Sequence, residues 1–316
     1  MPNRISDPDA SAYGTWQVNG EVNSADGQSS AQEAKVPALV IEPISGWQVI
    51  NWTELVQYRD LFYFLVRREV VSKYKQTVLG LSWALVKPFV QMVLFTIIFG
   101  GVAKISSDGV PHAVFYFTGL VPWTYFSGAM SNATSSLVAN KNIITKVYFP
   151  RLIIPMSTTL SKLLDFAIGM AFLPVIMAYY GVMPTWDALA LPLLILIMML
   201  SSAGIGMWLA GLSIQYRDIN HATSFLVQMM MYAAPVIWPV SELANYFAGS
   251  GWSTTVLYTY SLYPMVGVLE GFRAALLGTR PMPWDMIAIG GCVAIFLFVT
   301  GALYFKRLER RFADVA

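Results

Sequence analysis

The stretch Ala188–Tyr216, ALALPLLILIMMLSSAGIGMWLAGLSIQY, contains no charged residue. A helix needs about 20 mostly apolar residues to cross the hydrocarbon core of a bilayer, so this stretch is long enough. Small residues recur in it at Ser202, Gly206 and Ala210. A spacing of four places them on one helix face and favours close helix packing in lipid. The stretch therefore predicts a transmembrane helix that packs closely against a neighbour.

The composition of the whole chain agrees with a lipid environment. Of its 316 residues, 56% are hydrophobic and only 12% are charged, whereas soluble domains carry about 25% charged residues. This argues against a water-soluble enzyme or a nucleic-acid-binding protein. A single cysteine, Cys292, excludes an intrachain disulfide, and the two histidines, His112 and His221, form no zinc motif. We therefore expect no metal site and no catalytic residues.

Long gaps between charged residues divide the chain into candidate membrane spans. Six gaps fit: Pro88–Ala103 extended by Trp83–Val86, Ala113–Ser136, Leu152–Trp186, Ala188–Tyr216, Ile219–Ser241 and Met286–Phe305. A seventh gap, Leu243–Leu269, contains Gly, Ser, Thr, Asn and Pro residues that suit a lipid-facing helix poorly. We interpret the seventh gap as an external or re-entrant segment.

The distribution of basic residues predicts the orientation. Lys and Arg gather around 59–75, in the loops after the second and fourth spans, and at 306–311. Basic residues are enriched in cytoplasmic loops. Six spans place both ends of the chain on one side, so we expect both termini in the cytoplasm.

A basic segment precedes the first span and has helical spacing. One predicted helix face carries Leu55, Tyr58, Phe62, Leu65 and Val66, and the other carries Glu54, Gln57, Asp60, Arg67 and Arg68, with Leu61 and Phe64 interrupting the polar face. Such a helix lies in the headgroup region, either as a simple anchor or as a helix that also docks a cytoplasmic partner.

The fold class is thus an all-α membrane protein with six transmembrane helices, an amphipathic interfacial helix before them, and re-entrant helices between spans five and six. The expected divisions are a flexible cytoplasmic extension at 1–50, the interfacial helix at 51–76, the six-span transmembrane domain at 77–305 with an external segment at 241–278, and a cytoplasmic tail at 306–316.

Two details within this plan invite a functional interpretation. Lys162 and Asp165 are the charges within a span, and their spacing allows a mutually neutralising pair on one helix face or a contact with lipid-linked phosphate. The pair Phe149-Pro150 ends a basic loop. An exposed aromatic residue beside proline there suits insertion into a groove of a partner.

Five short motifs occur in order along residues 53–316. They are Tyr74-Lys75-Gln76-Thr77 with Leu79-Gly80, Trp83 and Pro88; Asn140-Lys141 with Lys146-Val147-Tyr148-Phe149-Pro150-Arg151; Tyr216-Arg217-Asp218; Tyr263-Pro264; and Phe312-Ala313-Asp314. In this order the chain resembles the permease subunit of type-2 ABC exporters for polysaccharides, the group that handles O-antigen, capsule and teichoic-acid chains.

The resemblance implies partners and a location. Two copies of the permease are expected to pair with two nucleotide-binding subunits in the bacterial cytoplasmic (inner) membrane, and to move a lipid-linked polysaccharide. The sequence contains no G-x-x-x-x-G-K-[ST] phosphate-binding loop. ATP and Mg²⁺ are therefore expected on the partner subunits, with no cofactor in this chain.

The resemblance also assigns candidate residues. Docking to the ATPase is expected at Leu79, Gly80, Lys141, Lys146, Tyr148, Phe149 and Arg151. The translocation path is expected along Phe89, Phe95, Phe99, Tyr232 and Trp238. An external gate is expected at Trp252, Tyr258, Tyr260, Tyr263, Glu270 and Arg273.

Other functions are weighed against this one. A membrane transferase acting on a lipid-linked sugar would show clustered acids, histidines or a metal-binding group near one interface. A secondary transporter would favour internal repeats and a buried acid relay. An exporter of teichoic acid or of a small amphiphile is a further alternative.

Overall fold

The computed structural model describes residues 56–75, 77, 80–144, 146, 149–216, 218–249 and 253–315, with side chains through Leu308. Every regular element within these ranges is helical, which confirms the predicted all-α class. In chain order the elements are α2 (Arg59–Tyr74), η1 (Gly80–Ser82), α3 (Trp83–Phe95), η2 (Thr96–Val102), α4 (His112–Ala139), α5 (Lys141–Ile144), α6 (Ile153–Ser161), α7 (Leu163–Tyr179), η3 (Trp186–Ala190), α8 (Leu191–Gln215), α9 (Ile219–Ala233), α10 (Val240–Tyr246), α11 (Ser253–Ser261), α12 (Pro264–Leu277) and α13 (Trp284–Val315). The predicted extension 1–50 lies outside the described residues.

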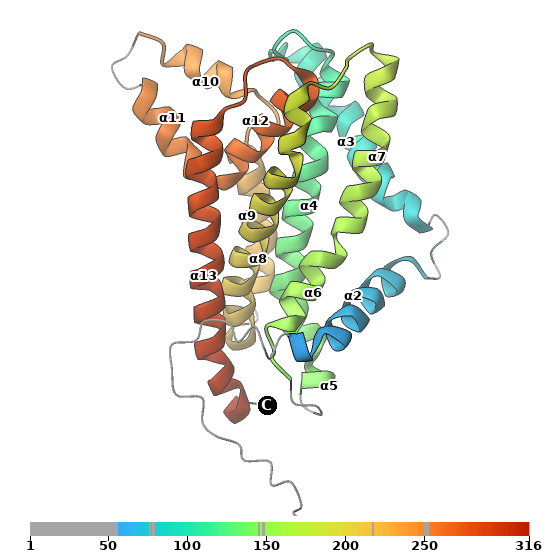
Figure 1. Ribbon diagram of the computed structural model, residues 1–316, viewed down its shortest axis with the longest axis vertical. Coiled ribbons are helices and arrows are strands. Elements are labelled where there is room, and N and C mark those ends of the chain that lie inside the picture. Colours follow the sequence, from blue (N-terminus) through green and yellow to red (C-terminus); the bar gives the residue numbers. More distant parts are fainter. Residues whose placement is uncertain are drawn as a thin grey trace, which may run out of the picture. The chain divides into compact units, whose positions relative to one another are not determined.

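The helices form a bundle with two distinct ends (Figure 1). The end that carries α2, α5 and the carboxyl-terminal part of α13 is called the basic end below. The opposite end carries α10, α11 and the loop between η2 and α4, and is called the α10–α11 end.

Four helical stretches within the described residues are long and apolar enough to cross a membrane. They are Gly80–Val102, Ile153–Tyr179, Trp186–Gln215 and Trp284–Leu308. They coincide with predicted spans one, three, four and six. The chain is therefore an integral membrane protein.

The other two predicted spans do not meet the same criterion, so the count of six stays a prediction. Helix α4 has 28 residues but carries many Ser, Thr and Tyr side chains, and it is buried along most of its length. Several of its hydroxyl groups are satisfied within the helix; Thr118 and Thr134, for example, donate to carbonyls one turn earlier. A helix surrounded by protein does not need the hydropathy of one that faces lipid.

Helix α9 is short for a different reason. Its 15 residues extend about 22 Å, less than the hydrocarbon thickness of about 30 Å. The chain continues from Ala234 as irregular backbone before α10 begins at Val240. Irregular backbone at membrane depth is tolerated where it is buried in protein, and residues 234–237 are buried.

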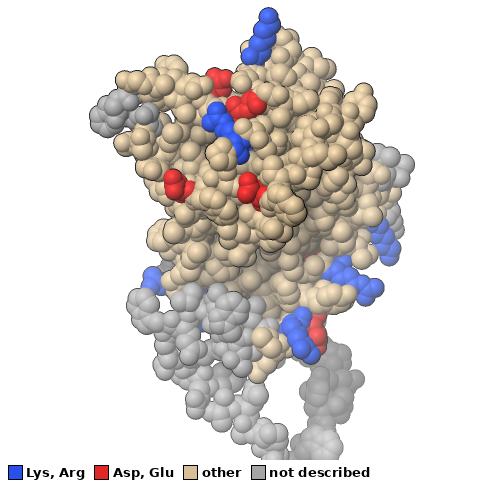
Figure 2. Space-filling model, turned by 45° about the horizontal axis from the view of Figure 1, so that its top comes forward, with Lys and Arg blue, Asp and Glu red and all other residues tan. Residues whose placement is uncertain are grey.

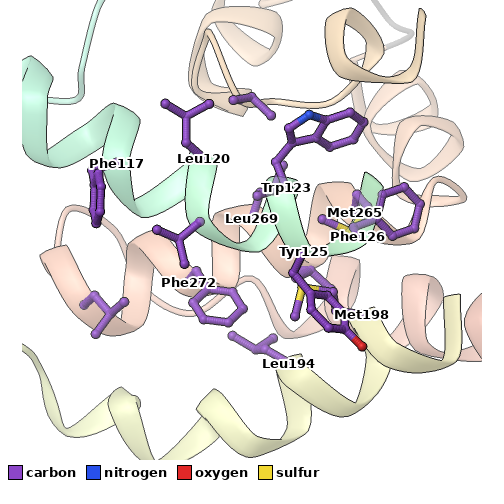
Figure 3. Packing of buried hydrophobic residues seen from close by; sticks show 14 of the residues in the cluster. Phe117, Leu120, Trp123, Tyr125, Phe126, Leu194, Met198, Met265, Leu269 and Phe272 are labelled. Atoms are coloured by element: carbon purple, nitrogen blue, oxygen red, sulfur yellow. The ribbon is translucent and has the colours of Figure 1, made fainter. Parts of the chain in front are cut away.

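The main core lies where α4, α8 and α12 meet (Figure 3). The labelled side chains are Phe117, Leu120, Trp123, Tyr125 and Phe126 of α4, Leu194 and Met198 of α8, and Met265, Leu269 and Phe272 of α12. Every residue of α12 is buried. The segment that the sequence predicted to be external or re-entrant therefore ends in a helix inside the bundle.

The predicted small-residue stripe of α8 packs against α4. A Cβ atom on Gly206 would lie 2.6 Å from the Cβ of Ala133, and Ser202 and Ala210 are buried on the same helix. A second close approach joins α8 to α13: a Cβ atom on Gly204 would lie 2.6 Å from the carbonyl carbon of Leu297. Close backbone approach of this kind is typical of membrane helices, which gain most of their association energy from packing.

Candidate functional site

The two ends of the bundle differ in charge. Figure 2, with the α10–α11 end turned forward, shows acidic side chains together with a few basic ones on that end, and mainly basic ones lower down. The described basic residues of the basic end are Arg59, Arg67, Arg68, Lys73, Lys75, Lys141, Lys146, Arg151, Lys306 and Arg307. The basic end is the one that the sequence predicts to face the cytoplasm, and this orientation stays a prediction.

Helix α2 packs on the protein as well as carrying exposed aromatic residues. Leu65 is buried in a second hydrophobic cluster, and Leu61 and Phe62 pack against that cluster. Tyr63 and Phe64, by contrast, are 70% and 58% exposed. The helix therefore has a protein-facing side and an apolar, outward-facing side that is available to lipid or to a partner.

The protein-facing side of α2 differs from the prediction in two residues. Arg68 was assigned to the polar face, but its guanidinium donates to the side-chain oxygen of Asn140 at the carboxyl end of α4. Leu61 was expected to interrupt the polar face and instead packs on the second cluster. Because α2 lies against α6 and the end of α4, the bundle and not the bilayer alone sets its rotation.

Asp165 joins α2 to the break between α6 and α7. The Nζ atom of Lys73 and the hydroxyl of Tyr74 both donate to its carboxylate. The Nζ atom of Lys162 lies 3.6 Å from the same group. The predicted pair of Lys162 and Asp165 is therefore present, but α2 supplies the other two partners of Asp165.

Replacing Asp165 with alanine is expected to loosen α2. The substitution removes the acceptor of both α2 donors, and hydrogen bonds to charged groups contribute about 1.5–3 kcal/mol. Hydrogen exchange of the α2 backbone amides should accelerate roughly tenfold or more, since local opening sets the exchange rate. Asp60→Ala, which removes an exposed carboxylate paired with Arg59, is the matched control. Equal exchange in the two variants would contradict this role of Asp165.

The predicted docking residues occupy different environments. Lys141 in α5 and Lys146 are exposed, and Arg151 is half-buried. Gly80 has φ +50°, a left-handed conformation that favours glycine at the turn into α3. Leu79 and Tyr148 lie outside the described residues.

The prediction for Phe149 is wrong. We expected an exposed aromatic residue, but Phe149 is only 3% exposed. It belongs to the second hydrophobic cluster with Leu65, Ile153 and Phe305. Because α2 and α13 converge on this loop, the ring is enclosed within the subunit and cannot insert into a partner.

The five predicted path residues differ in exposure. Phe89 of α3 and Tyr232 of α9 are 41% and 51% exposed. Phe95 and Phe99 pack against the main core, and the ring of Phe95 meets that of Tyr116 at 5.8 Å. Trp238 is half-buried and lies two residues before α10.

Two tyrosines predicted for the gate bind the carboxyl-terminal end of α9. The hydroxyl of Tyr260 donates to the carbonyl of Ala233 at 2.7 Å, and that of Tyr263 to the carbonyl of Met230 at 3.4 Å. The last carbonyls of a helix lack intrahelical partners; Tyr260 supplies one to Ala233, and Tyr263 adds a second donor to Met230, which already accepts from the amide of Ala234. These hydroxyls therefore stabilise the end of α9. Tyr258 is exposed, and Trp252 lies outside the described residues.

Glu270 and Arg273, also predicted for the gate, form an ion pair inside the bundle. The Nη1 atom of Arg273 lies 2.9 Å from Oε1 of Glu270, and Arg273 is only 2% exposed. Its guanidinium carbon lies 3.7 Å from the centre of the Phe115 ring, which adds a cation–π contact.

The same ion pair holds the irregular segment between α9 and α10. Arg273 donates through Nη2 to the carbonyl of Val236 at 2.9 Å. The amide of Val240 donates to Oε1 of Glu270 at 3.2 Å. The sequence analysis assigned both residues to an external gate; the apolar residues around them in α12 were the signal that they are buried.

Among the described residues, no group of three or more His, Cys, Asp or Glu side chains is placed to hold a metal ion. The main features of the described residues are a basic end with exposed aromatic residues, the buried ion pair of Glu270 and Arg273, and the segment between α9 and α10 that this pair holds. Together with four membrane-long apolar helices, they define a multi-span integral membrane protein.

The chain belongs to the ABC-2 type transporter family, which matches residues 60–277. It is 28% identical over 257 residues to the O-antigen export system permease protein RfbA of Myxococcus xanthus, covering 81% of this chain and 95% of that protein. It is 26% identical to the protein of the same name from Klebsiella pneumoniae, with the same coverage. These matches confirm the type-2 ABC permease predicted from the motifs. Permeases of this family work with ATPase subunits.

Proposed function

We propose that the chain is the transmembrane subunit of an ATP-driven exporter that moves a lipid-linked polysaccharide, of O-antigen or capsule type, across the bacterial inner membrane. The observation that carries this proposal is the match to two O-antigen export permeases over nearly their whole length. The four membrane-long apolar helices support a role within the membrane, as a transport subunit requires.

The working unit in this proposal contains two copies of the chain and two nucleotide-binding subunits that carry ATP and Mg²⁺. The basic end is the docking surface, and two features support it. Tyr63 and Phe64 of α2 are exposed and apolar, and Lys141 and Lys146 add exposed positive charge. Exposed apolar patches with charged surroundings mark interaction sites.

The six-span topology, with both termini in the cytoplasm, is part of the same proposal. The spans beyond the four apolar helices are α4 and the segment that begins with α9. Re-entrant helices α10 and α11 then close the outer end, with the exposed ring of Tyr258 and the bound hydroxyls of Tyr260 and Tyr263 in that gate. Phe89 and Tyr232, which are exposed on α3 and α9, are the path residues that this chain supports best.

The proposal is tested with the ATPase partner. Cells that lack both subunits receive the permease with an intact partner or with a hydrolysis-dead one, and surface polysaccharide is measured. Display that requires hydrolysis supports an ATP-driven exporter, whereas display with the inactive partner contradicts it. If the transported compound proves to be teichoic acid or a small amphiphile, that compound and not an O-antigen or capsule polysaccharide is the substrate.

Charge reversal at the basic end is expected to weaken assembly. The double variant Lys141→Glu and Lys146→Glu should lower recovery of the ATPase with the permease by roughly tenfold, since each exposed charge contact contributes about 0.2–1 kcal/mol and like charges repel. Lys104→Glu at the opposite end is the control and should leave recovery unchanged. Equal recovery from all three proteins, at equal membrane levels, would show that this loop is not the docking site.

A further inference from the structure

A cavity of about 690 Å³ lies at the α10–α11 end, between the loop after η2 and helix α10. It is lined by Ala103, Lys104, Ile105, Ser106, Trp238, Glu242, Leu243, Asn245 and Tyr246. These residues define what we call the outer cleft. Ligand pockets of small molecules typically measure about 300–1,000 Å³, so the outer cleft has the size of a binding site.

The loop wall of the outer cleft is fixed by several polar contacts. The hydroxyl of Ser241 donates to Oδ1 of Asp108 at 2.7 Å, which connects this loop to the start of α10. The Nε atom of Arg280 lies 3.4 Å from Oδ2 of the same carboxylate. On the other side, a ring nitrogen of His112 lies 2.9 Å from the carbonyl of Ile105. The two walls are therefore held at a set separation.

Trp238 is held by the buried ion pair described above. It lies between Val236, whose carbonyl binds Arg273, and Val240, whose amide binds Glu270. Both ends of this short segment are thus anchored to α12. The backbone on either side of Trp238 is therefore fixed and its side chain lines the outer cleft, so this segment needs little further ordering when a ligand binds.

The polar side chains of the cleft are available to a ligand. Within the described residues, the side chains of Lys104, Glu242 and Asn245 form no hydrogen bond or ion pair. Together they offer ammonium and amide donors and carboxylate and amide acceptors. One cation and one anion face the same space, so the cleft has no net preference for an anionic group.

This combination matches the chemistry of a sugar ring. Trp238 and Tyr246 supply flat apolar surfaces, and the three polar side chains supply partners for hydroxyl groups that point to the rim of the ring. An anionic lipid headgroup would instead favour a cluster of basic residues.

We propose that the outer cleft binds a neutral sugar unit of the exported chain as it leaves the bundle. This inference rests on the proposed export function and adds a binding site on the outer side of the transporter. Trp238 stacks on the ring, and Lys104, Glu242 and Asn245 bind its hydroxyls.

Binding is tested with the permease–ATPase complex in lipid nanodiscs. The probe is surface polysaccharide from the producing cells, freed of lipid by mild acid and fractionated to short oligosaccharides. Saturation transfer from protein to sugar protons is measured by NMR. Trp238→Ala should weaken binding about tenfold, as expected for the loss of one stacking contact. Trp186→Ala removes an exposed tryptophan outside the outer cleft and should bind like the unmodified protein.

A second measurement covers the case in which Trp238→Ala does not fold. In a Cys292→Ser background, Asn245→Cys places one thiol in the outer cleft and Trp186→Cys places one outside it. The oligosaccharide should slow maleimide labelling at position 245 and not at 186, and inorganic phosphate should protect neither. Position 245 should be open to labelling in cells when no sugar is added.

Several results would overturn the proposal. These are no saturation transfer, equal transfer in Trp238→Ala, protection by phosphate, or a position 245 closed to labelling because a second copy covers it. The proposed export function is judged separately by surface display that depends on hydrolysis. If surface display depends on hydrolysis but no sugar binds at the outer cleft, the binding site is rejected and the proposed export function is retained.

Discussion

Replacing Glu270 with alanine is expected to cause the largest loss of stability of any single change considered for this protein. The substitution leaves the buried guanidinium of Arg273 without its carboxylate. Removing one partner of a buried ion pair costs about 3–5 kcal/mol, because the remaining charge is uncompensated in a low-dielectric interior. The variant also removes the acceptor of the Val240 amide, which frees the segment that carries Trp238.

The expected result is a lower yield of folded protein in membranes and a marked drop in the unfolding temperature of the purified permease. The double variant Glu270→Leu and Arg273→Met is the control, since replacing both charges by apolar groups of similar volume is often neutral or stabilising. It should be more stable than Glu270→Ala. If Glu270→Ala unfolds at the temperature of the unmodified protein, the buried pair is not a structural element of the core.

The second large effect is expected at the crossing of α8 and α13. A Cβ atom on Gly204 would lie 2.6 Å from both the carbonyl carbon of Leu297 and the amide nitrogen of Phe298. The opposing atoms belong to the backbone of α13 and cannot move aside as a side chain could. Gly301 meets the carbonyl oxygen of Gly204 in the same way, at 2.5 Å for its added Cβ.

Gly204→Ala is therefore expected to push the two helices apart at a cost of about 3 kcal/mol, the upper part of the usual range for overpacking. The measurement is the unfolding temperature in detergent, together with the fraction of monodisperse protein after heating. Gly291→Ala in α13 is the matched control, because its added Cβ would lie 3.4 Å from the flexible end of Ile197. Equal unfolding temperatures for the two variants would show that the helices cross with more space than the structure indicates.

The sequence was sufficient to predict the helical class and the long apolar helices. The charge-free stretch around α8 became one of the four membrane-long helices because nothing in it opposes lipid burial. The five short motifs were sufficient to predict the protein family. The same gap between charged residues located α4. It did not predict that α4 is buried along most of its length at the centre of the bundle.

Contacts between distant elements could not be predicted. The spacing of Lys162 and Asp165 indicates a local pair, whereas the bonds from Lys73 and Tyr74 connect segments about 90 residues apart. Phe149 looked exposed because it ends a basic loop, and it is buried because α2 and α13 cover that loop. Helical spacing alone cannot say which neighbour a helix face will meet.

The central claim, that this chain carries polysaccharide outward, is tested most directly by deleting its gene and locating the lipid-linked polymer. The account predicts that lipid-linked polysaccharide accumulates on the cytoplasmic side while surface polysaccharide disappears, and that the intact gene restores display. Undiminished surface polysaccharide in the deletion strain, with no internal accumulation, would contradict the account.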